Sequence, residues 1–486
     1  MLSKAVVTEL VSICGRERVL TEPEDLIGYS FDATAALPRR RPEAVVLPVS
    51  TEEVVQVVKL AGRRRIPIYP RGSGTNLSGG TIPLEGGIVL VTTMMNSILE
   101  VDAENLTATV QPGVIVQTLN DAVASYGLIY PPDPGTVATA TMGGTVAECS
   151  GGLRGLKYGV TKHYVMGLEV VLADGNVLRA GGKTVKNVTG YDLVKLFTGS
   201  EGTLGIITGI TVKLIPAPEH RRTMMAVFDD LDRAAKTISE IISHKVIPAT
   251  LEILDRVTIQ AVEEHARIGL PTEAEAILLI EVDGIREVVE KEAAVVLEVC
   301  RRQGAASIRA AETDAERDEL WAARRAALPA LAQLKPTMVL EDATVPRSKI
   351  PEMIRGLNDI ASKYRLKIGT FGHAGDGNLH PTILTDVSDE EEMARVERAV
   401  DEIFTLALQL GGTLSGEHGI GMAKAKYLEQ EFGPAGVEVM ARIKHALDPL
   451  GLLNPGKIFP PAQGKILSQG EAGVKEQTPA AREGLG

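Results

Sequence analysis

Glycine is unusually dense between residues 142 and 205, and this density constrains the fold of the 486-residue chain more than any other feature. Because glycine lacks a Cβ atom, its backbone can approach another group closely and can form turns that other residues avoid. A second glycine-rich segment, RGSGTNLSGG at 71–80, follows the run IPIYP at 66–70, which ends at Pro70 and predicts a strand. The two segments therefore predict backbone that folds closely around a bound group.

The length of the chain predicts two or three domains, because a single hydrophobic core rarely grows to this size. The proline-containing segment KLIPAPEH at 213–220 is the expected boundary. Beyond it, strand and helix patterns alternate with short links, which predicts a ferredoxin-like α+β layer. The expected domains are 1–216, 217–410 and a returning C-terminal segment at 411–459, followed by a polar tail at 460–486 that is expected to be disordered.

Hydrophobic periodicity predicts most of the elements after this boundary. We expect helices at 230–243, 255–265, 285–303, 313–332, 351–363 and 389–410, and strands at 249–254, 276–282 and 337–345. Before the boundary, the capping pattern Ser50–Glu53 predicts the start of a helix.

Composition excludes several classes of function. The formal net charge of −12 and the absence of a long basic run argue against nucleic-acid binding. No apolar run is long enough to span a membrane, and the three cysteines form no CxxC pair, so neither an iron–sulfur cluster nor a disulfide framework is indicated. We expect a cytoplasmic protein without a transmembrane segment.

The segment RGSGTNLSGG at 71–80 fits no common nucleotide-binding fingerprint. Its third glycine comes too late for a Rossmann loop, no helix is expected after it, and the Gly-Lys-Ser/Thr of a Walker loop is absent. Two interpretations remain open: an anion nest for a diphosphate, or a tight surface turn.

The stretch FGHAGDGNLH at 371–380 holds a quarter of the eight histidines in the chain. It predicts a hairpin in which Ala374 faces Leu379 and His373 faces His380, with Cβ atoms about 5 Å apart on one side. The pair could share a metal ion or be a hydrogen-bonded core pair. Glu417 would complete a set suited to Zn²⁺, Mn²⁺ or Fe²⁺, and the adjacent His418 could act as a base. A solvated Glu-His pair in a loop is the alternative.

The glycine-rich segments resemble the FAD-binding domain of the vanillyl-alcohol oxidase/p-cresol methylhydroxylase flavoprotein superfamily. This resemblance implies an α+β fold, with a two-subdomain FAD-binding domain of p-cresol methylhydroxylase type, a ferredoxin-like cap domain and a C-terminal helical segment. It implies non-covalent FAD, since the first loop contains neither histidine nor cysteine and Cys149 does not stand where an attachment would be expected. The residues expected to contact FAD are Pro70, Arg71, Gly72, Ser73, Gly74, Thr75, Asn76, Ser78, Gly79, Pro132, Asp133, Thr141, Gly143, Gly144, Ser150, Gly152, Tyr158, Gly159, Glu201, Gly205, Ile206 and Asn454.

The motifs at 371–380 and 411–428, with LNPGKIF at 453–459, resemble the C-terminal FAD-linked oxidase domain of the D-lactate dehydrogenase/glycolate oxidase flavoprotein subunit family. The resemblance implies that the metal ligands are His373, His380 and Glu417, and that the active-site residues are His418, Arg324 and Asn378. Relatives specific for D-2-hydroxyglutarate have a lysine and a threonine where this chain has Leu340 and Leu328. These differences favour a small monocarboxylate.

The resemblance implies FAD-dependent oxidation of a small D-2-hydroxy acid, D-lactate or glycolate, with His418 as base and a divalent metal polarising the substrate. The electrons would pass to a separate acceptor: an iron–sulfur subunit, an electron-transferring flavoprotein or a quinone. Such a partner could hold the protein at a membrane surface. The alternatives are a D-2-hydroxyglutarate dehydrogenase, an enzyme acting on an alkyl-glycerone phosphate or aromatic alcohol, a metal-dependent hydrolase, and a non-catalytic flavin-binding subunit.

Overall fold

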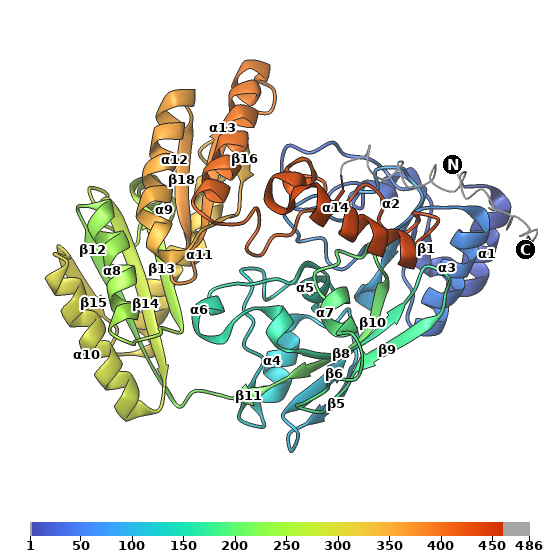
Figure 1. Ribbon diagram of the computed structural model, residues 1–486, viewed down its shortest axis with the longest axis horizontal. Helices are drawn as coiled ribbons and strands as arrows, with labels where there is room; N and C mark the ends of the chain where they lie inside the picture. Colours follow the sequence, from blue (N-terminus) through green and yellow to red (C-terminus); the bar gives the residue numbers. More distant parts are fainter. Residues whose placement is uncertain (1, 460–486) are drawn as a thin grey trace, which may run out of the picture.

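The computed structural model describes residues 2–459, which fold into two lobes that face each other (Figure 1). The first lobe contains the elements before residue 217 and the C-terminal helix. The second lobe is built on one large sheet whose strands lie between residues 220 and 385. The tail at 460–486, predicted to be disordered, lies outside the described residues.

The first lobe begins with a four-stranded sheet in the order β1-β2-β4-β3, in which β2 and β3 both run parallel to β4. Ser50 caps the main helix beside it by accepting from the backbone N–H of Glu53, as the capping pattern predicts. The elements are α1 Lys4–Cys14, β1 Val19–Leu20, α2 Pro23–Ile27, β2 Ala44–Val46, α3 Thr51–Arg64, β3 Ile68–Arg71 and β4 Ile88–Val91.

A five-stranded antiparallel sheet, ordered β5-β6-β10-β8-β9, follows in the first lobe, together with a separate antiparallel pair of β7 and β11. Short helices cover it on the side that faces the second lobe (Figure 1). The elements are β5 Ile98–Asp102, β6 Thr107–Val110, α4 Val116–Ala124, β7 Leu128–Ile129, α5 Met142–Glu148, α6 Gly155–Tyr158, β8 Val165–Val171, β9 Val177–Gly181, α7 Leu193–Phe197, β10 Ile206–Lys213 and β11 Ile215–Pro216.

The second lobe holds an eight-stranded sheet with the main order β15-β12-β14-β13-β18-β19-β16 and β17 paired to β19. Its first half follows the predicted β-α-β-β-α-β pattern, with α9 inserted between the two middle strands. The elements are β12 His220–Phe228, α8 Leu231–Ser243, β13 Thr250–Asp255, α9 Arg256–Ala266, β14 Ala276–Gly284, α10 Arg286–Arg302, β15 Ser307–Ala310, α11 Asp314–Leu331, β16 Thr337–Leu340, β17 Ala343–Thr344, α12 Ile350–Tyr364, β18 Lys367–His373, β19 Asn378–Thr385 and α13 Glu390–Gln409.

Both faces of this sheet are covered by helices, which explains why its central strands bury apolar side chains on both faces. Along β14, Leu278 and Ile280 join the core under α8, α10, α12 and α13, whereas Ile277 and Leu279 join the core under α9 and α11. Successive side chains of β14 therefore point to opposite faces of the sheet, as the two-residue period of a strand requires.

The segment 337–345, predicted as one strand, is interrupted. β16 ends at Leu340 and β17 begins at Ala343, and both intervening carboxylates, Glu341 and Asp342, are buried. The prediction of a continuous strand was therefore wrong at Glu341 and Asp342, and the carboxylate of Asp342 contacts the segment that carries Glu417 and His418.

After α13 the chain returns to the first lobe. Leu453 forms a parallel bridge with Ile68, and the side-chain amide of Asn454 donates to the carbonyls of Gly80 and Glu201. The helix α14 Leu428–Leu447 is kinked at Gly433, which has a non-helical φ of 64°. The next residue, Pro434, has no backbone N–H and cannot continue the helical hydrogen-bond ladder.

Candidate active site

A cavity of about 770 Å³ opens between the lobes and takes its lining from both of them and from the returning C-terminal segment. The volume lies in the range of about 300–1,000 Å³ that is usual for small-molecule and cofactor sites. Of the residues predicted to act, those that line it are Pro70, Arg71, Gly72, Ser73, Gly74, Thr75, Asn76, Asp133, Thr141, Gly143, Gly144, Ser150, Glu201, Gly205, Ile206, Arg324, His373, His380, Glu417, His418 and Asn454.

The glycine loop after β3 forms one wall of this cavity, and no helix follows it, as predicted. A Cβ atom on Gly72 would lie 2.2 Å from Thr141 Oγ1, and one on Gly74 (φ +76°) would lie 2.1 Å from the guanidinium of Arg71. The buried Asp32 holds the loop by accepting from the side-chain amide of Asn76 at 2.7 Å. The loop therefore presents main chain to the cavity, which suits a diphosphate.

Six residues predicted to contact FAD do not line the cavity: Ser78, Gly79, Pro132, Gly152, Tyr158 and Gly159. The backbone carbonyl of Ser78 accepts from the backbone N–H groups of Met422 and Ala423, and the hydroxyl of Tyr158 donates to Asp283. The structure therefore places these two against other protein groups.

The two histidines of the hairpin point to the same side, although their pairing differs from the prediction. His373 pairs with Asn378, and His380 pairs with Phe371, because the loop is 374–377 and begins one residue earlier than expected. The register shift is two residues, which preserves the face of the sheet on which each side chain lies. The ring centroids are 5.1 Å apart.

Glu417 lies between these histidines. Its Oε1 atom is 3.2 Å from His373 Nε2 and 3.2 Å from His380 Nε2. Burial alone would raise the pKa of Glu417, but the charge of His373 and hydrogen bonds from both histidines outweigh burial and hold the pKa well below its usual range. Two imidazole nitrogens and a carboxylate oxygen facing one another are a common donor set for Zn²⁺. The residues present therefore fit a divalent metal.

Glu252 is a site residue that the sequence reasoning missed. It is fully buried on β13, and its two oxygens accept from Arg324 Nε at 2.5 Å and from His373 Nδ1 at 2.7 Å. Burial raises the pKa of Glu252, yet His373 and Arg324 outweigh it and lower the pKa overall. The carboxylate thus connects the predicted substrate-binding arginine to a predicted metal ligand. A glutamate inside the apolar strand pattern TLEILD was the signal that could have revealed it.

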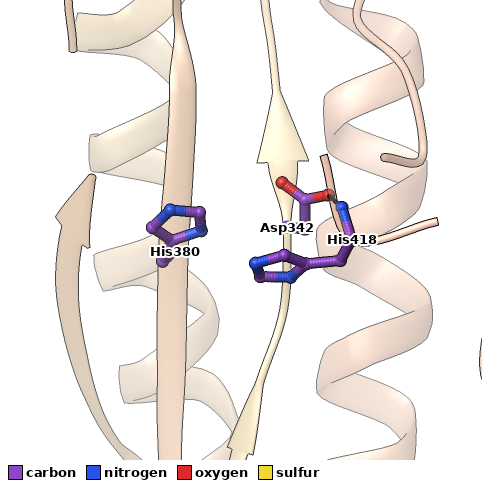
Figure 2. Close-up of side chains that lie close together, drawn as sticks. All are labelled: Asp342, His380 and His418. Carbon is purple, nitrogen blue, oxygen red and sulfur yellow. Dashed lines mark hydrogen bonds between the residues drawn. The ribbon is translucent and has the colours of Figure 1, made fainter. Parts of the chain in front are cut away.

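Asp342 is the second missed residue, and Figure 2 shows it beside His380 and His418. Its Oδ2 atom accepts from Ser415 Oγ and from the backbone N–H groups of Glu417 and His418, at 2.6, 3.1 and 3.0 Å. It therefore fixes the turn that carries a predicted metal ligand and the predicted base.

His418 stacks on His380 with ring centroids 5.1 Å apart. Burial lowers the pKa of His418 to about 4, against the opposing effect of Asp342, so the imidazole is neutral at pH 7. A neutral imidazole can accept a proton.

Asn378 does not line the cavity; its Oδ1 accepts from the hydroxyl of Thr344 at 3.0 Å. Leu328 and Leu340 do line it; both pack against the apolar cluster that contains Phe371, and the guanidinium of Arg324 lies over the ring of Phe371. The wall is therefore apolar at the two positions where dicarboxylate-specific relatives are expected to carry polar side chains.

Two family models match the chain: "FAD binding domain" over residues 42–181 and "FAD linked oxidases, C-terminal domain" over residues 217–458. Among solved structures, p-cresol methylhydroxylase superposes with a TM-score of 0.77 at 20% identity, covering 94% of this chain and 96% of that one. An alkyldihydroxyacetonephosphate synthase gives a TM-score of 0.73 at 21% identity, covering 94% of this chain and 86% of that one. These structures establish the fold, and the predicted fold class is confirmed. The chain is an FAD-linked oxidoreductase.

Curated relatives refine this assignment. Glycolate oxidase subunit GlcD of Bacillus subtilis is 53% identical over 459 residues, covering 94% of this chain and 97% of that protein. The D-lactate dehydrogenase of Archaeoglobus fulgidus is 39% identical over 437 residues, covering 88% and 95%. The chain belongs to this glycolate oxidase subunit/D-lactate dehydrogenase family of FAD-linked oxidases, within the vanillyl-alcohol oxidase/p-cresol methylhydroxylase superfamily, which confirms the predicted family and the FAD cofactor.

Within residues 2–459, no helix combines the length and apolar character needed to cross a bilayer.

Proposed function

We propose that this protein oxidises a small D-2-hydroxy acid, glycolate or D-lactate, to the 2-oxo acid. The observation that carries the proposal is the convergence of Arg324, the His373–His380–Glu417 cluster and His418 in the same cavity as the glycine loop. The names of the curated relatives, glycolate oxidase subunit and D-lactate dehydrogenase, support this substrate class.

Each of these residues has its own role in the proposed reaction. The guanidinium of Arg324, fixed through Nε by Glu252, binds the substrate carboxylate with its remaining N–H groups. His418, neutral at pH 7, accepts the proton of the substrate hydroxyl. Leu328 and Leu340 exclude water and a second carboxylate from the substrate side chain. FAD, when bound without a covalent link, supplies the acceptor for the hydride of the α-carbon.

His373, His380 and Glu417 would hold a divalent metal, Zn²⁺, Mn²⁺ or Fe²⁺. Such an ion would favour the ionised form of the substrate hydroxyl and would fix the substrate pose. The cavity would then offer both a metal ion and the guanidinium of Arg324, which suits a substrate with an anionic carboxylate and a hydroxyl on adjacent carbons.

The reduced protein would pass its electrons to a separate acceptor: an iron–sulfur subunit, an electron-transferring flavoprotein or a quinone. The word "subunit" in the name of the Bacillus relative supports a multi-component enzyme. We place the protein in the cytoplasm, held at the membrane surface only through such a partner. We also propose the domain division 1–216, 217–410 and 411–459, with the last segment returning to the flavin.

The test is an anaerobic titration of the purified, metal-replete protein with glycolate, D-lactate and L-lactate, followed by the flavin absorbance band. Bleaching by glycolate and D-lactate, but not by L-lactate, is the expected result. His418→Gln should slow flavin reduction at least about 100-fold, the usual range for loss of a general base. His265→Gln, at an exposed position on α9, is the matched control. A flavin that stays oxidised with both acids would overturn the substrate assignment.

A further inference from the structure

His373 and His380 face the same oxygen of Glu417 but differ in what holds their outer nitrogen. His373 Nδ1 donates to Glu252. Among the described residues, His380 Nδ1 is a buried atom without a hydrogen-bond partner. A histidine that binds a metal through one nitrogen almost always donates its other N–H to a carboxylate, a carbonyl or a water molecule. His380 therefore needs an acceptor.

The carboxylate of Asp342 lies close to His380. It is completely buried, and three donors occupy Oδ2, whereas Oδ1 has no partner within the part of the chain that the structure describes. Asp342, His380 and His418 each place one nitrogen or oxygen atom within 4.8 Å of the other two (Figure 2). Polar groups at this spacing are joined through a single water molecule, which needs two to four polar partners.

We propose that Asp342 is the positioning residue of His380: through one bridging water molecule it accepts the outer N–H of His380, as Glu252 does directly for His373. The inference rests on the metal site of the proposed function. The nearby ammonium of Lys424, 3.5 Å from Oδ2, favours the ionised carboxylate.

The arrangement gives Asp342 two connected tasks. Through Oδ1 it orients the ring of His380, and through Oδ2 it accepts from the backbone N–H groups of Glu417 and His418. The same carboxylate thus fixes two of the three predicted metal ligands. A competing interpretation is that Asp342, His380 and His418 themselves bind a second cation, since their donor atoms also suit one.

The test measures metal affinity rather than turnover. The FAD-containing protein is freed of metal with a chelator and titrated with Zn²⁺ alone against a chromophoric competitor. Wild type should bind one equivalent. Asp342→Asn should bind the same equivalent about 10–100-fold more weakly, the usual loss when an outer partner of a metal ligand is removed. Ser415→Ala, which removes only one of the donors to Oδ2, is the matched control and should stay within about threefold of wild type.

The outcomes separate the alternatives. Asp342→Asn protein that binds Zn²⁺ as tightly as wild type overturns the inference alone. If wild type binds two equivalents of Zn²⁺, and Asp342→Asn loses one of them while the affinity for the other is unchanged, the inference is also overturned. That result would favour a second cation bound by Asp342, His380 and His418. Wild type that binds no Zn²⁺ overturns the proposed metal site and this inference with it. If Asp342→Asn does not retain FAD, Asp342→Ser, which is smaller and keeps a hydroxyl, must show the same weakening.

Discussion

His373 Nδ1 donates to Glu252 Oε1 at 2.7 Å, so a fully buried carboxylate on β13 orients a histidine on the adjacent strand β18. The other oxygen of Glu252 accepts from Arg324 at 2.5 Å. Since the two contacts use different oxygens of one rigid carboxylate, the arginine and the histidine cannot move independently. Substrate binding and metal binding should therefore depend on the same residue.

Glu252→Gln should lower kcat/KM for glycolate about 100-fold, mainly through a higher KM. A glutamine amide has one oxygen and one NH₂ group, so it can accept from Arg324 or from His373 but not from both. Steady-state kinetics on the FAD- and metal-replete protein measure the effect. Glu275→Gln, in a surface pair with Arg256, is the control and should leave kcat/KM unchanged. A kcat/KM of Glu252→Gln within threefold of wild type would contradict the prediction.

Glu201→Ala should destabilise the returning C-terminal segment. The carboxylate of Glu201 accepts from the backbone N–H groups of Ile420 and Gly421, both at 2.7 Å. Leaving two buried donors unpaired costs about 2–6 kcal/mol in the free energy of unfolding, at about 1–3 kcal/mol each. The midpoint of thermal FAD release, followed by flavin fluorescence, should fall by several degrees. Glu438→Ala, which removes an exposed pair with Arg442, should change it little.

The sequence predicted the elements of the second lobe well because their hydrophobic periods are clear. The helices predicted at 230–243 and 285–303 are found as Leu231–Ser243 and Arg286–Arg302. The faces of His373 and His380 were also predicted correctly, because a two-residue register shift keeps each side chain on its face.

Hydrophobic periodicity could not predict that Glu252 and Asp342 lie at the site. No spacing in the sequence connects Glu252 to Arg324, 72 residues away, or Asp342 to His418, 76 residues away. The first contact arises only when α11 packs on β13, and the second only when the 411–424 segment meets the residues between β16 and β17. What the sequence does contain is an acidic residue within each apolar strand pattern, and a buried charge needs a partner.

The difference in unfolding free energy between Asp255→Asn and wild type, variant minus wild type, should increase as the pH rises from about 4 to 6.5. Burial raises the pKa of Asp255 from 3.8 to about 6, against its hydrogen bonds with Thr258 and Thr370. In this range the unfolded chain releases the proton while the folded protein retains it, so wild type loses stability as the pH rises through the folded pKa. The loss is at most about 3 kcal/mol, from about 1.4 kcal/mol per pKa unit. Denaturant unfolding at several pH values measures the difference, and a pH-independent difference would contradict it.

Leu340→Lys should move substrate preference toward dicarboxylates. Leu340 lies at the end of β16 and lines the cavity together with Leu328 and Arg324. An ammonium group there would form an ion pair with the second carboxylate of D-2-hydroxyglutarate. In wild type this carboxylate would be buried against apolar side chains without a partner, which is unfavourable. The ratio of kcat/KM for D-2-hydroxyglutarate to that for glycolate should rise at least about tenfold, equivalent to about 1.4 kcal/mol. Leu340→Met, which conserves volume without adding charge, is the matched control and should leave the ratio unchanged. An equal change in both variants would mean that the shape of this wall, rather than its charge, selects the substrate.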